Sequence, residues 1–369
     1  MFPFRKRQRH LNLALQGGGA HGAFTWGVLD RLLEAPTLRL GWLSGTSAGA
    51  INAVALAAGL AEGGHAGARK KLHDIWEAVI DAGVPDLMRL NPFLYGLSRA
   101  PAMGQIGSMF SPYDINPLGL DPLRKLLEAH IDFRRLRAAS GINLLIAATD
   151  VATGRGRIFR RAELSVEAVL ASACLPTLHH AVEIEGRAYW DGGFSANPDL
   201  LTLAAESPVA DTLLVLLNPI EKPGIPRSAR DIAADVNRIT FSLPLLRDIT
   251  EIAHHIDEPR SVWRRQRSRG TRIGAHRFHL IEAGRHTDTL APETKMRPDR
   301  ALLTQLHNAG REEAHRWLGL NLAQVGRRSS VDLAAHFLAP FRPLASADSN
   351  GAGDADTQRQ EAEALADKL

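Results

Sequence analysis

Three glycine-centred segments carry the residues of this chain that could do chemistry. The central segment, Gly45-Thr46-Ser47-Ala48-Gly49, has the pattern G-x-S-x-G. Between a strand and a helix, the small residues of this pattern allow a sharp turn that presents the serine hydroxyl. The amino end of the following helix favours negative charge that develops beside it. The segment therefore predicts that Ser47 is a nucleophile, and an ordinary glycine-rich turn is the alternative.

The first glycine segment, Gly17-Gly18-Gly19-Ala20-His21-Gly22, follows the apolar stretch Leu11–Gln16. As a string it also fits the G-x-G-x-x-G pattern of dinucleotide sites, which need an acidic residue at the end of the next strand. That strand ends in Ser44-Gly45-Thr46-Ser47 and offers no carboxylate. The loop's uncovered N–H groups suit a phosphate or an oxyanion equally. If the two strands are parallel neighbours, the N–H groups of Gly18 and Gly19 could face a carbonyl that Ser47 attacks.

The third segment, Asp191-Gly192-Gly193, follows the predicted strand Ala188–Trp190. A serine nucleophile needs a base to accept its proton. Histidine is the usual base, but the chain has 15 histidines, so composition does not select one. Asp191 stands at a strand end, where the glycines after it leave room for a close approach. A turn aspartate is equally consistent with the local sequence.

In their order and spacing, the three segments resemble the patatin-like phospholipases, most strongly from about Leu11 to Pro198. The resemblance implies that Ser47 is the nucleophile and Asp191 the general base of a Ser–Asp dyad without a catalytic histidine. It implies an oxyanion hole formed by Gly17, Gly18 and Gly19, and no metal or cofactor. The remaining motif glycines are Gly22, Gly45, Gly49, Gly192 and Gly193. Many members carry arginine where this chain has His21, so His21 is a candidate substrate contact, and a preference for phospholipid over other esters stays open.

The elements that must position these residues alternate between strand and helix. Strands are expected at 11–16, 40–43, 143–149, 157–159, 188–190, 212–217 and 276–281. Helices are expected at 20–34, 48–61, 68–80, 122–130, 165–172, 228–269 and 299–318. This alternation, together with the resemblance, predicts a patatin-like three-layer α/β/α fold around a central, mostly parallel sheet.

The chain is expected to form one large catalytic domain with flanking segments. The domain spans residues 11–325 with its motif core at 11–207, after a basic extension at 1–10. A connecting segment at 326–342 leads to a disordered acidic tail at 343–369. Residues 84–122 contain six of the 20 prolines and three of the five methionines. They are interpreted either as a mobile lid or as an irregular excursion packed on the core.

Composition and charge narrow the class of protein. With 45% hydrophobic and 23% charged residues, a disordered or fibrous chain is excluded. The single cysteine, Cys174, excludes a disulfide framework and is expected to be buried. The net charge is +4, and 37 of the 44 basic residues are arginine. Eight of them lie in Arg260–Arg285, which is interpreted as a solvated helix face or as a contact with anionic lipid headgroups. No nucleic-acid motif accompanies them.

No targeting segment is expected, because the apolar stretch after the basic start is too short for a signal peptide. The 22 uncharged residues Leu40–Ala61 are interpreted as a strand, a turn and a buried helix rather than a membrane span. The pairs His179-His180 and His254-His255 lack a metal-binding spacing. We therefore expect a cytoplasmic protein, with peripheral contact to an anionic membrane surface as an option.

The combined prediction is a serine acyl hydrolase of lipid esters, of the phospholipase A type, that forms an acyl-enzyme intermediate. The alternatives within enzymes are a carboxylesterase and an intracellular polyester hydrolase. A non-catalytic membrane-binding protein with the same fold and a nucleotide-binding oxidoreductase are the alternatives from other classes.

Overall fold

The computed structural model of the chain describes residues 8–82, 111–119, 121–139, 141–222, 224–257, 269–288, 290–296 and 298–338. The described residues up to Phe337 belong to one compact unit. The predicted tail and most of the predicted lid lie outside the described residues. The last part of the predicted lid contains the short helix α6 (Pro112–Ile115).

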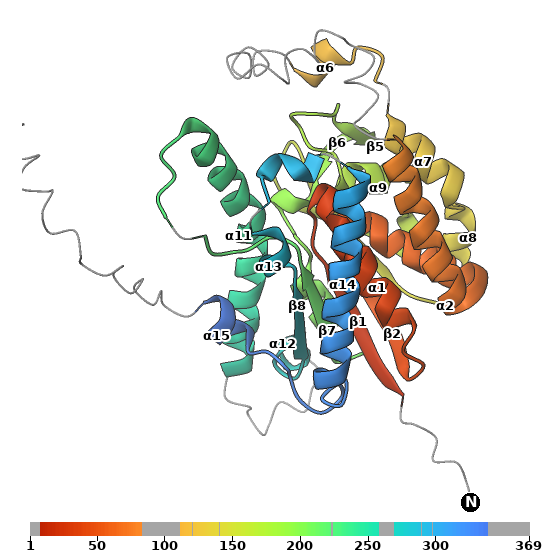
Figure 1. Ribbon diagram of the computed structural model, residues 1–369, viewed down its shortest axis with the longest axis vertical. Coiled ribbons are helices and arrows are strands. Elements are labelled where there is room, and N and C mark those ends of the chain that lie inside the picture. Colours follow the sequence, from red (N-terminus) through yellow and green to blue (C-terminus); the bar gives the residue numbers. More distant parts are fainter. Residues whose placement is uncertain are drawn as a thin grey trace, which may run out of the picture. The chain divides into compact units, whose positions relative to one another are not determined.

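An eight-stranded sheet forms the centre of the molecule (Figure 1). Its strands are β1 (Arg9–Leu15), β2 (Leu38–Gly45), β3 (Leu144–Asp150), β4 (Gly156–Arg160), β5 (Val182–Ile184), β6 (Arg187–Asp191), β7 (Asp211–Leu216) and β8 (Arg277–Glu282). They follow the order β5-β6-β3-β2-β1-β7-β8, and β4 pairs with β3 beside this path. The five strands from β3 to β8 in this order are parallel, whereas β4 and β6 run antiparallel to β3 and β5 runs antiparallel to β6. The expected mostly parallel sheet is confirmed.

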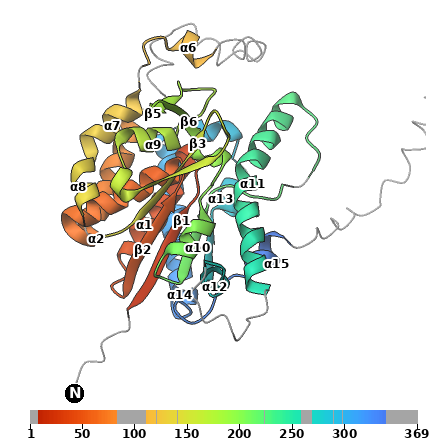
Figure 2. The same cartoon turned by 180° about the vertical axis from the view of Figure 1, so that it is seen from behind.

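Helices cover both faces of the sheet, as the two opposite views show (Figures 1 and 2). One core joins the sheet to α1 (Gly22–Leu33), α2 (Ala48–Ala82), α7 (Pro122–His130), α8 (Phe133–Ala138), α9 (Val166–Ser172) and α14 (Arg300–Asn321). The other core joins it to α10 (Leu200–Glu206), α11 (Ala229–Asp257), α12 (Arg269–Gly274) and α15 (Leu333–Phe337). The short elements are α13 (Gly284–Thr287), η1 (Gly19–His21), η3 (Arg161–Glu163), η4 (Gly192–Phe194) and η5 (Pro292–Met296). This is the expected three-layer α/β/α fold.

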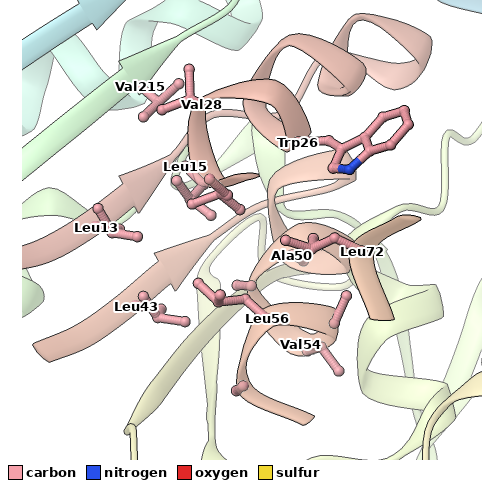
Figure 3. Close-up of a cluster of buried hydrophobic side chains, with 14 of the residues drawn as sticks. Leu13, Leu15, Trp26, Val28, Leu43, Ala50, Val54, Leu56, Leu72 and Val215 are labelled. Atoms are coloured by element: carbon pink, nitrogen blue, oxygen red, sulfur yellow. The ribbon is translucent and has the colours of Figure 1, made fainter. Parts of the chain in front are cut away.

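Residues of β1 show how the sequence builds these two cores. Successive side chains of a strand point to opposite faces of the sheet. Leu13 and Leu15 accordingly pack into the first core, with Val28 and Leu43 (Figure 3). Ala14 packs into the second core. The buried part of β1 is apolar on both sides, as a sheet covered on both faces requires, except at Asn12, whose side chain donates to Val209 and Thr212.

The pairing register places the ends of the site-bearing strands at one level. Gly45, the last residue of β2, pairs with Ile146 of β3. On the other side of β3, Asp191 pairs with Ala148, two residues further along. Ser47 lies two residues beyond Gly45, so the register brings Ser47 and Asp191 to the same height along β3. β1 lies next to β2 and parallel to it, which places the first glycine loop at the same edge of the sheet.

Three local details concern the expected elements. The two helices expected at 48–61 and 68–80 carry one label, α2, but Gly63 and Gly64 between them have non-helical dihedral angles. β1 begins at Arg9, inside the predicted basic extension. The three-residue strand β5 was not expected from the sequence.

Candidate active site

Ser47 occupies a sharp turn between β2 and α2. Its φ is 55°, the left-handed region that non-glycine residues rarely adopt. A side chain at Gly49 would collide with the carbonyl oxygen of Leu15, so the helix can start this close to β1 only with glycine there. Ser47 is partly exposed, whereas Thr46 and Ala48 on either side are buried. The turn thus presents the hydroxyl of one residue out of an otherwise buried segment.

Hydrogen bonds from distant parts of the chain hold this turn. The Ser47 amide donates to Oγ of Ser172, at the end of α9, over 3.1 Å. The Thr46 hydroxyl donates to the carbonyl oxygen of Ala196 over 2.7 Å. Ser172 and Thr46 are both fully buried. Because these bonds hold both Ser47 and the residue before it, the strained conformation is maintained by the surrounding structure.

Asp191 ends β6 and is fully buried. Its Oδ1 accepts a hydrogen bond of 2.7 Å from the Gly193 amide, and its own amide donates to the carbonyl oxygen of Cys174 over 2.8 Å. Burial raises the pKa of the carboxyl from 3.8 to about 7, and the Gly193 amide and the Ser47 hydroxyl oppose that rise. The second oxygen, Oδ2, is buried without a well-formed hydrogen bond. A carboxyl with a pKa near neutrality beside a serine hydroxyl is suited to accept and return a proton.

The first glycine loop packs directly against this pair. A Cβ atom on Gly17 would lie 2.9 Å from Cβ of Ser47. The Gly17 amide donates to Oδ1 of Asn197 over 2.8 Å, and its carbonyl oxygen accepts from Nδ2 of Asn218 over 3.1 Å. No hydrogen bond joins the amides of Gly18 and Gly19 to any other described residue. These two amides, rather than that of Gly17, are therefore the available donors for an oxyanion.

Gly19 is the point where η5 meets the loop. Its φ is +57°, and a Cβ atom there would collide with the carbonyl oxygen of Lys295. Burial lowers the pKa of the Lys295 ammonium to about 8. The segment before α14 thus fixes the conformation of the loop, although it follows the loop by more than 270 residues.

The side chain of His21, within the same loop, is buried. Its Nε2 lies 2.8 Å from Oγ1 of Thr294, whose hydroxyl donates to the carbonyl oxygen of Ala291. This assigns the proton of the neutral ring to Nε2, which donates to Thr294. Burial and the nearby Lys295 lower the pKa of His21 to about 4. At neutral pH the glycine loop therefore carries no positive charge from His21.

Several contributors were not expected from the sequence. Asn197 holds Gly17, Ser172 holds Ser47, and Lys295 packs on Gly19. Phe241 of α11 fills the space above Gly193 so tightly that a side chain there would collide with its ring. Only Asn197, six residues after Asp191, has a sequence position that could have drawn attention.

The remaining candidate groups take no direct part in the arrangement of Ser47 and the glycine loop. Cys174 is buried as expected, and burial together with Asp191 raises its thiol pKa to about 12. Within the described ranges, no three His, Cys, Asp or Glu side chains are grouped so that they could hold a metal ion. Among the described helices, none is both long and apolar enough to cross a membrane.

Comparison with known proteins identifies the family. The family model described as Patatin-like phospholipase matches residues 13–204, more than half of the chain. The chain therefore belongs to the patatin-like phospholipase family. A search of curated proteins gives no match.

Solved structures with a related fold are distant. VipD from Legionella pneumophila is 14% identical with a TM-score of 0.39, and the match covers 84% of this chain and 67% of VipD. The type III effector ExoU is 17% identical with a TM-score of 0.31, and the match covers 84% of this chain and 54% of that protein. The ExoU–SpcU complex of Pseudomonas aeruginosa gives 15% identity, a TM-score of 0.29, and coverage of 85% and 52%. The chain thus spans about two thirds of VipD and about half of the ExoU chains, and likenesses this low support no argument about function.

Proposed function

We propose that this chain is a serine acyl hydrolase of lipid esters that works through a Ser47–Asp191 dyad. The observation that carries the proposal is the environment of Asp191, which is fully buried. Burial raises the pKa of its carboxyl to about 7, and the hydroxyl of Ser47 opposes this rise. Membership of the patatin-like phospholipase family supports a lipid substrate. The strained, partly exposed position of Ser47 supports its role as nucleophile.

In the first half of the reaction, the Asp191 carboxylate accepts the proton of Ser47 while Oγ bonds to the acyl carbon. The carbonyl electrons move to oxygen, and the amides of Gly18 and Gly19 stabilise the oxyanion. When the oxyanion collapses, the bond from the acyl carbon to the alkoxyl oxygen breaks. The leaving alcohol takes the proton from Asp191 and departs, and the acyl group stays on Ser47.

The second half releases the acid. Water gives a proton to Asp191 and its oxygen bonds to the acyl carbon of the acyl-enzyme. Ser47 Oγ then leaves and regains the proton from Asp191, which restores the starting state. No other proton acceptor is needed, because one carboxyl serves in both halves.

The test is a set of variants assayed on a soluble p-nitrophenyl ester and on phospholipid vesicles. Ser47→Ala and Asp191→Asn should each remove nearly all activity, and the double variant should lose little more, since the two groups act as a unit. Labelling by a fluorophosphonate should depend on Ser47. An Asp191→Asn enzyme that keeps more than about a tenth of the wild-type kcat would contradict the dyad, because general-base catalysis is worth about 10²–10⁴.

A second candidate, hydrolysis of a neutral ester other than a phospholipid, is favoured by one observation. His21 is uncharged at neutral pH and bonded to Thr294, so it offers no cation to a phosphate. A profile of p-nitrophenyl chain lengths set against phospholipid vesicles separates the two substrates. Preference for short chains with no action on vesicles would favour the second candidate.

We also propose peripheral contact with an anionic membrane surface, as the chain's net charge of +4 suggests. Binding to anionic vesicles that weakens in high salt would support an electrostatic contribution. Binding that is insensitive to salt would argue against it.

A further inference from the structure

A stripe of exposed aliphatic side chains runs along the N-terminal half of α11. Its members are Ile232, Val236, Ile239 and Leu243, which we call the α11 stripe. Their exposed fractions are 47%, 58%, 47% and 43%. Spacings of four, three and four residues place all of them on one side of a helix. The stripe is therefore a continuous apolar face rather than a set of scattered residues.

The C-terminal half of the same helix behaves differently. Leu245, Ile249 and Ile252 are buried in the second core. Thr250, about two helical turns beyond the stripe on the same side, is exposed and polar. Continuous apolar exposure is thus confined to the first half of α11, which stands at the periphery of the molecule (Figure 2).

The opposite side of this half-helix contacts the candidate active site. Phe241 lies about half a turn from the stripe and packs on Gly193, with its ring 4.7 Å from that of Phe194. Its carbonyl oxygen accepts a hydrogen bond of 3.0 Å from Asn197. Whatever covers the stripe is consequently held one helix diameter from the loop that carries Asp191.

We propose that the α11 stripe is a docking surface that inserts into the interface of a lipid bilayer and so delivers ester substrate to the site. The inference rests on the proposed function, because the active site needs to lie close to a bilayer only if its substrate is a lipid ester. Aliphatic side chains without a specific polar pattern suit the acyl region of a membrane, which offers no hydrogen-bonding partners.

The residues at the two ends of the stripe match the headgroup region. Arg227, just before α11, and Arg247, one turn after Leu243, are exposed and bracket the stripe. Arginine at this depth can reach lipid phosphates while the aliphatic residues lie deeper. Two acidic groups flank the stripe on α11. Asp231 is exposed and accepts from the hydroxyl of Ser228 over 2.7 Å, and Asp235 is paired with Lys222 and Arg238.

A second copy of the chain fits the stripe less well. A stable protein interface buries about 800 Å² on each partner. Four aliphatic side chains that are each about half exposed supply only a part of that area. Insertion into a bilayer needs no such minimum, because each buried side chain contributes separately.

The experiment compares Val236→Ser/Ile239→Ser with the matched control Ile256→Ser in the full chain. Ile256 is also exposed, at 50%, but lies near the C-terminal end of α11, about 20 Å from Leu243 along the helix. Partitioning is measured by co-sedimentation with vesicles of phosphatidylcholine, alone and with phosphatidylglycerol. Hydrolysis of a soluble short-chain p-nitrophenyl ester is measured in parallel, and circular dichroism checks folding.

The partition coefficient of the double variant should be at least about tenfold lower than that of wild type for both kinds of vesicle. Its kcat/KM on the soluble ester should stay within about twofold of wild type, and Ile256→Ser should match wild type in both assays. Unchanged partitioning of the double variant, or no vesicle binding by wild type, would overturn the proposal. A changed oligomeric state with unchanged vesicle binding would overturn it in favour of a second copy.

Ser47→Ala separates this inference from the proposed catalysis. It should bind vesicles as wild type does while hydrolysing neither substrate. Vesicle binding that does not depend on the stripe, together with hydrolysis that still depends on Ser47, would refute the docking surface alone. Hydrolysis that persists in Ser47→Ala would refute the proposed function and leave the binding result to be judged by itself.

Discussion

Replacing Asp191 by Asn should abolish activity and yet raise the stability of the folded protein relative to wild type as the pH rises. In the folded protein, burial raises the pKa of this carboxyl from 3.8 to about 7. In the unfolded chain the same carboxyl ionises near its ordinary value. Between these two values the unfolded state has lost the proton that the folded state still holds. Folding stability contributed by this group therefore falls as the pH rises from about 4 to about 7.

The size of the effect follows from the two pKa values. Each tenfold change in proton affinity is worth about 1.36 kcal/mol, so full ionisation of the buried carboxyl costs about 4 kcal/mol. Above about pH 5.5 this carboxyl is already ionised in the unfolded chain, and only the folded carboxyl still loses its proton as the pH rises to about 8.5. Roughly half of the cost develops over this range. The Asn side chain does not ionise and therefore has no such pH-dependent cost. The stability of Asp191→Asn relative to wild type should thus increase by about 2 kcal/mol over that range.

Urea unfolding followed by tryptophan fluorescence at the two pH values measures this difference. Any local cost of the amide is independent of pH and cancels in the comparison. Asp132→Asn is a suitable control, because Asp132 caps α8 and accepts from the Arg135 amide over 3.0 Å. That bond lowers the pKa of Asp132, so its contribution is complete above about pH 4 and its loss should be the same at both pH values. If the Asp191→Asn difference also stays constant, Asp191 does not have a raised pKa and the argument for it as a base near neutrality fails.

Three further predictions concern the same site. On a soluble ester, kcat/KM should rise with pH through about 7, because the Asp191 base must be ionised, and a flat profile from about pH 5 to 8 would contradict this. Gly19→Ala should lower kcat at least about tenfold and cost about 1–3 kcal/mol of stability, because residue 19 has a positive φ and the new Cβ collides with the Lys295 carbonyl oxygen. Kinetics and urea unfolding close to those of wild type would show that the loop tolerates the side chain. Cys174 should resist iodoacetamide at about pH 8 in the folded protein and react in urea, because burial raises its pKa to about 12, and rapid alkylation of folded protein would show that the thiol is accessible.

The sequence predicted the local parts of the site well. The strand, turn and helix around Ser47 were predicted because an apolar run, a glycine-rich turn and an Ala-rich run follow one another within a few residues. The parallel pairing of β1 and β2 followed from the strand–helix–strand order. The break between the expected helices at 48–61 and 68–80 is found at Gly63 and Gly64. In each case, neighbours in the sequence determine the conformation.

Contacts between distant segments were beyond that reasoning. The sequence suggested three glycine amides for an oxyanion hole, but Asn197 occupies the amide of Gly17 in the structure. It left His21 open as a substrate contact, whereas the ring is buried and bonded to Thr294. No local pattern marks Thr294 as a partner of residue 21, because η5 reaches the loop only through the arrangement of the whole sheet and α14.

By itself, the sequence determined which residues are chemically suited to act: a serine in a tight turn, glycines with uncovered amides, and an aspartate at a strand end. These depend on residue type and on neighbours a few positions away. Only the tertiary structure decided that Asp191 is fully buried, that its pKa lies near neutrality, and that α11 presents one side to the Asp191 loop and an apolar stripe on the other. Burial and electrostatic environment are set by segments that lie tens to hundreds of residues apart, so they arise only when the sheet order brings those segments together.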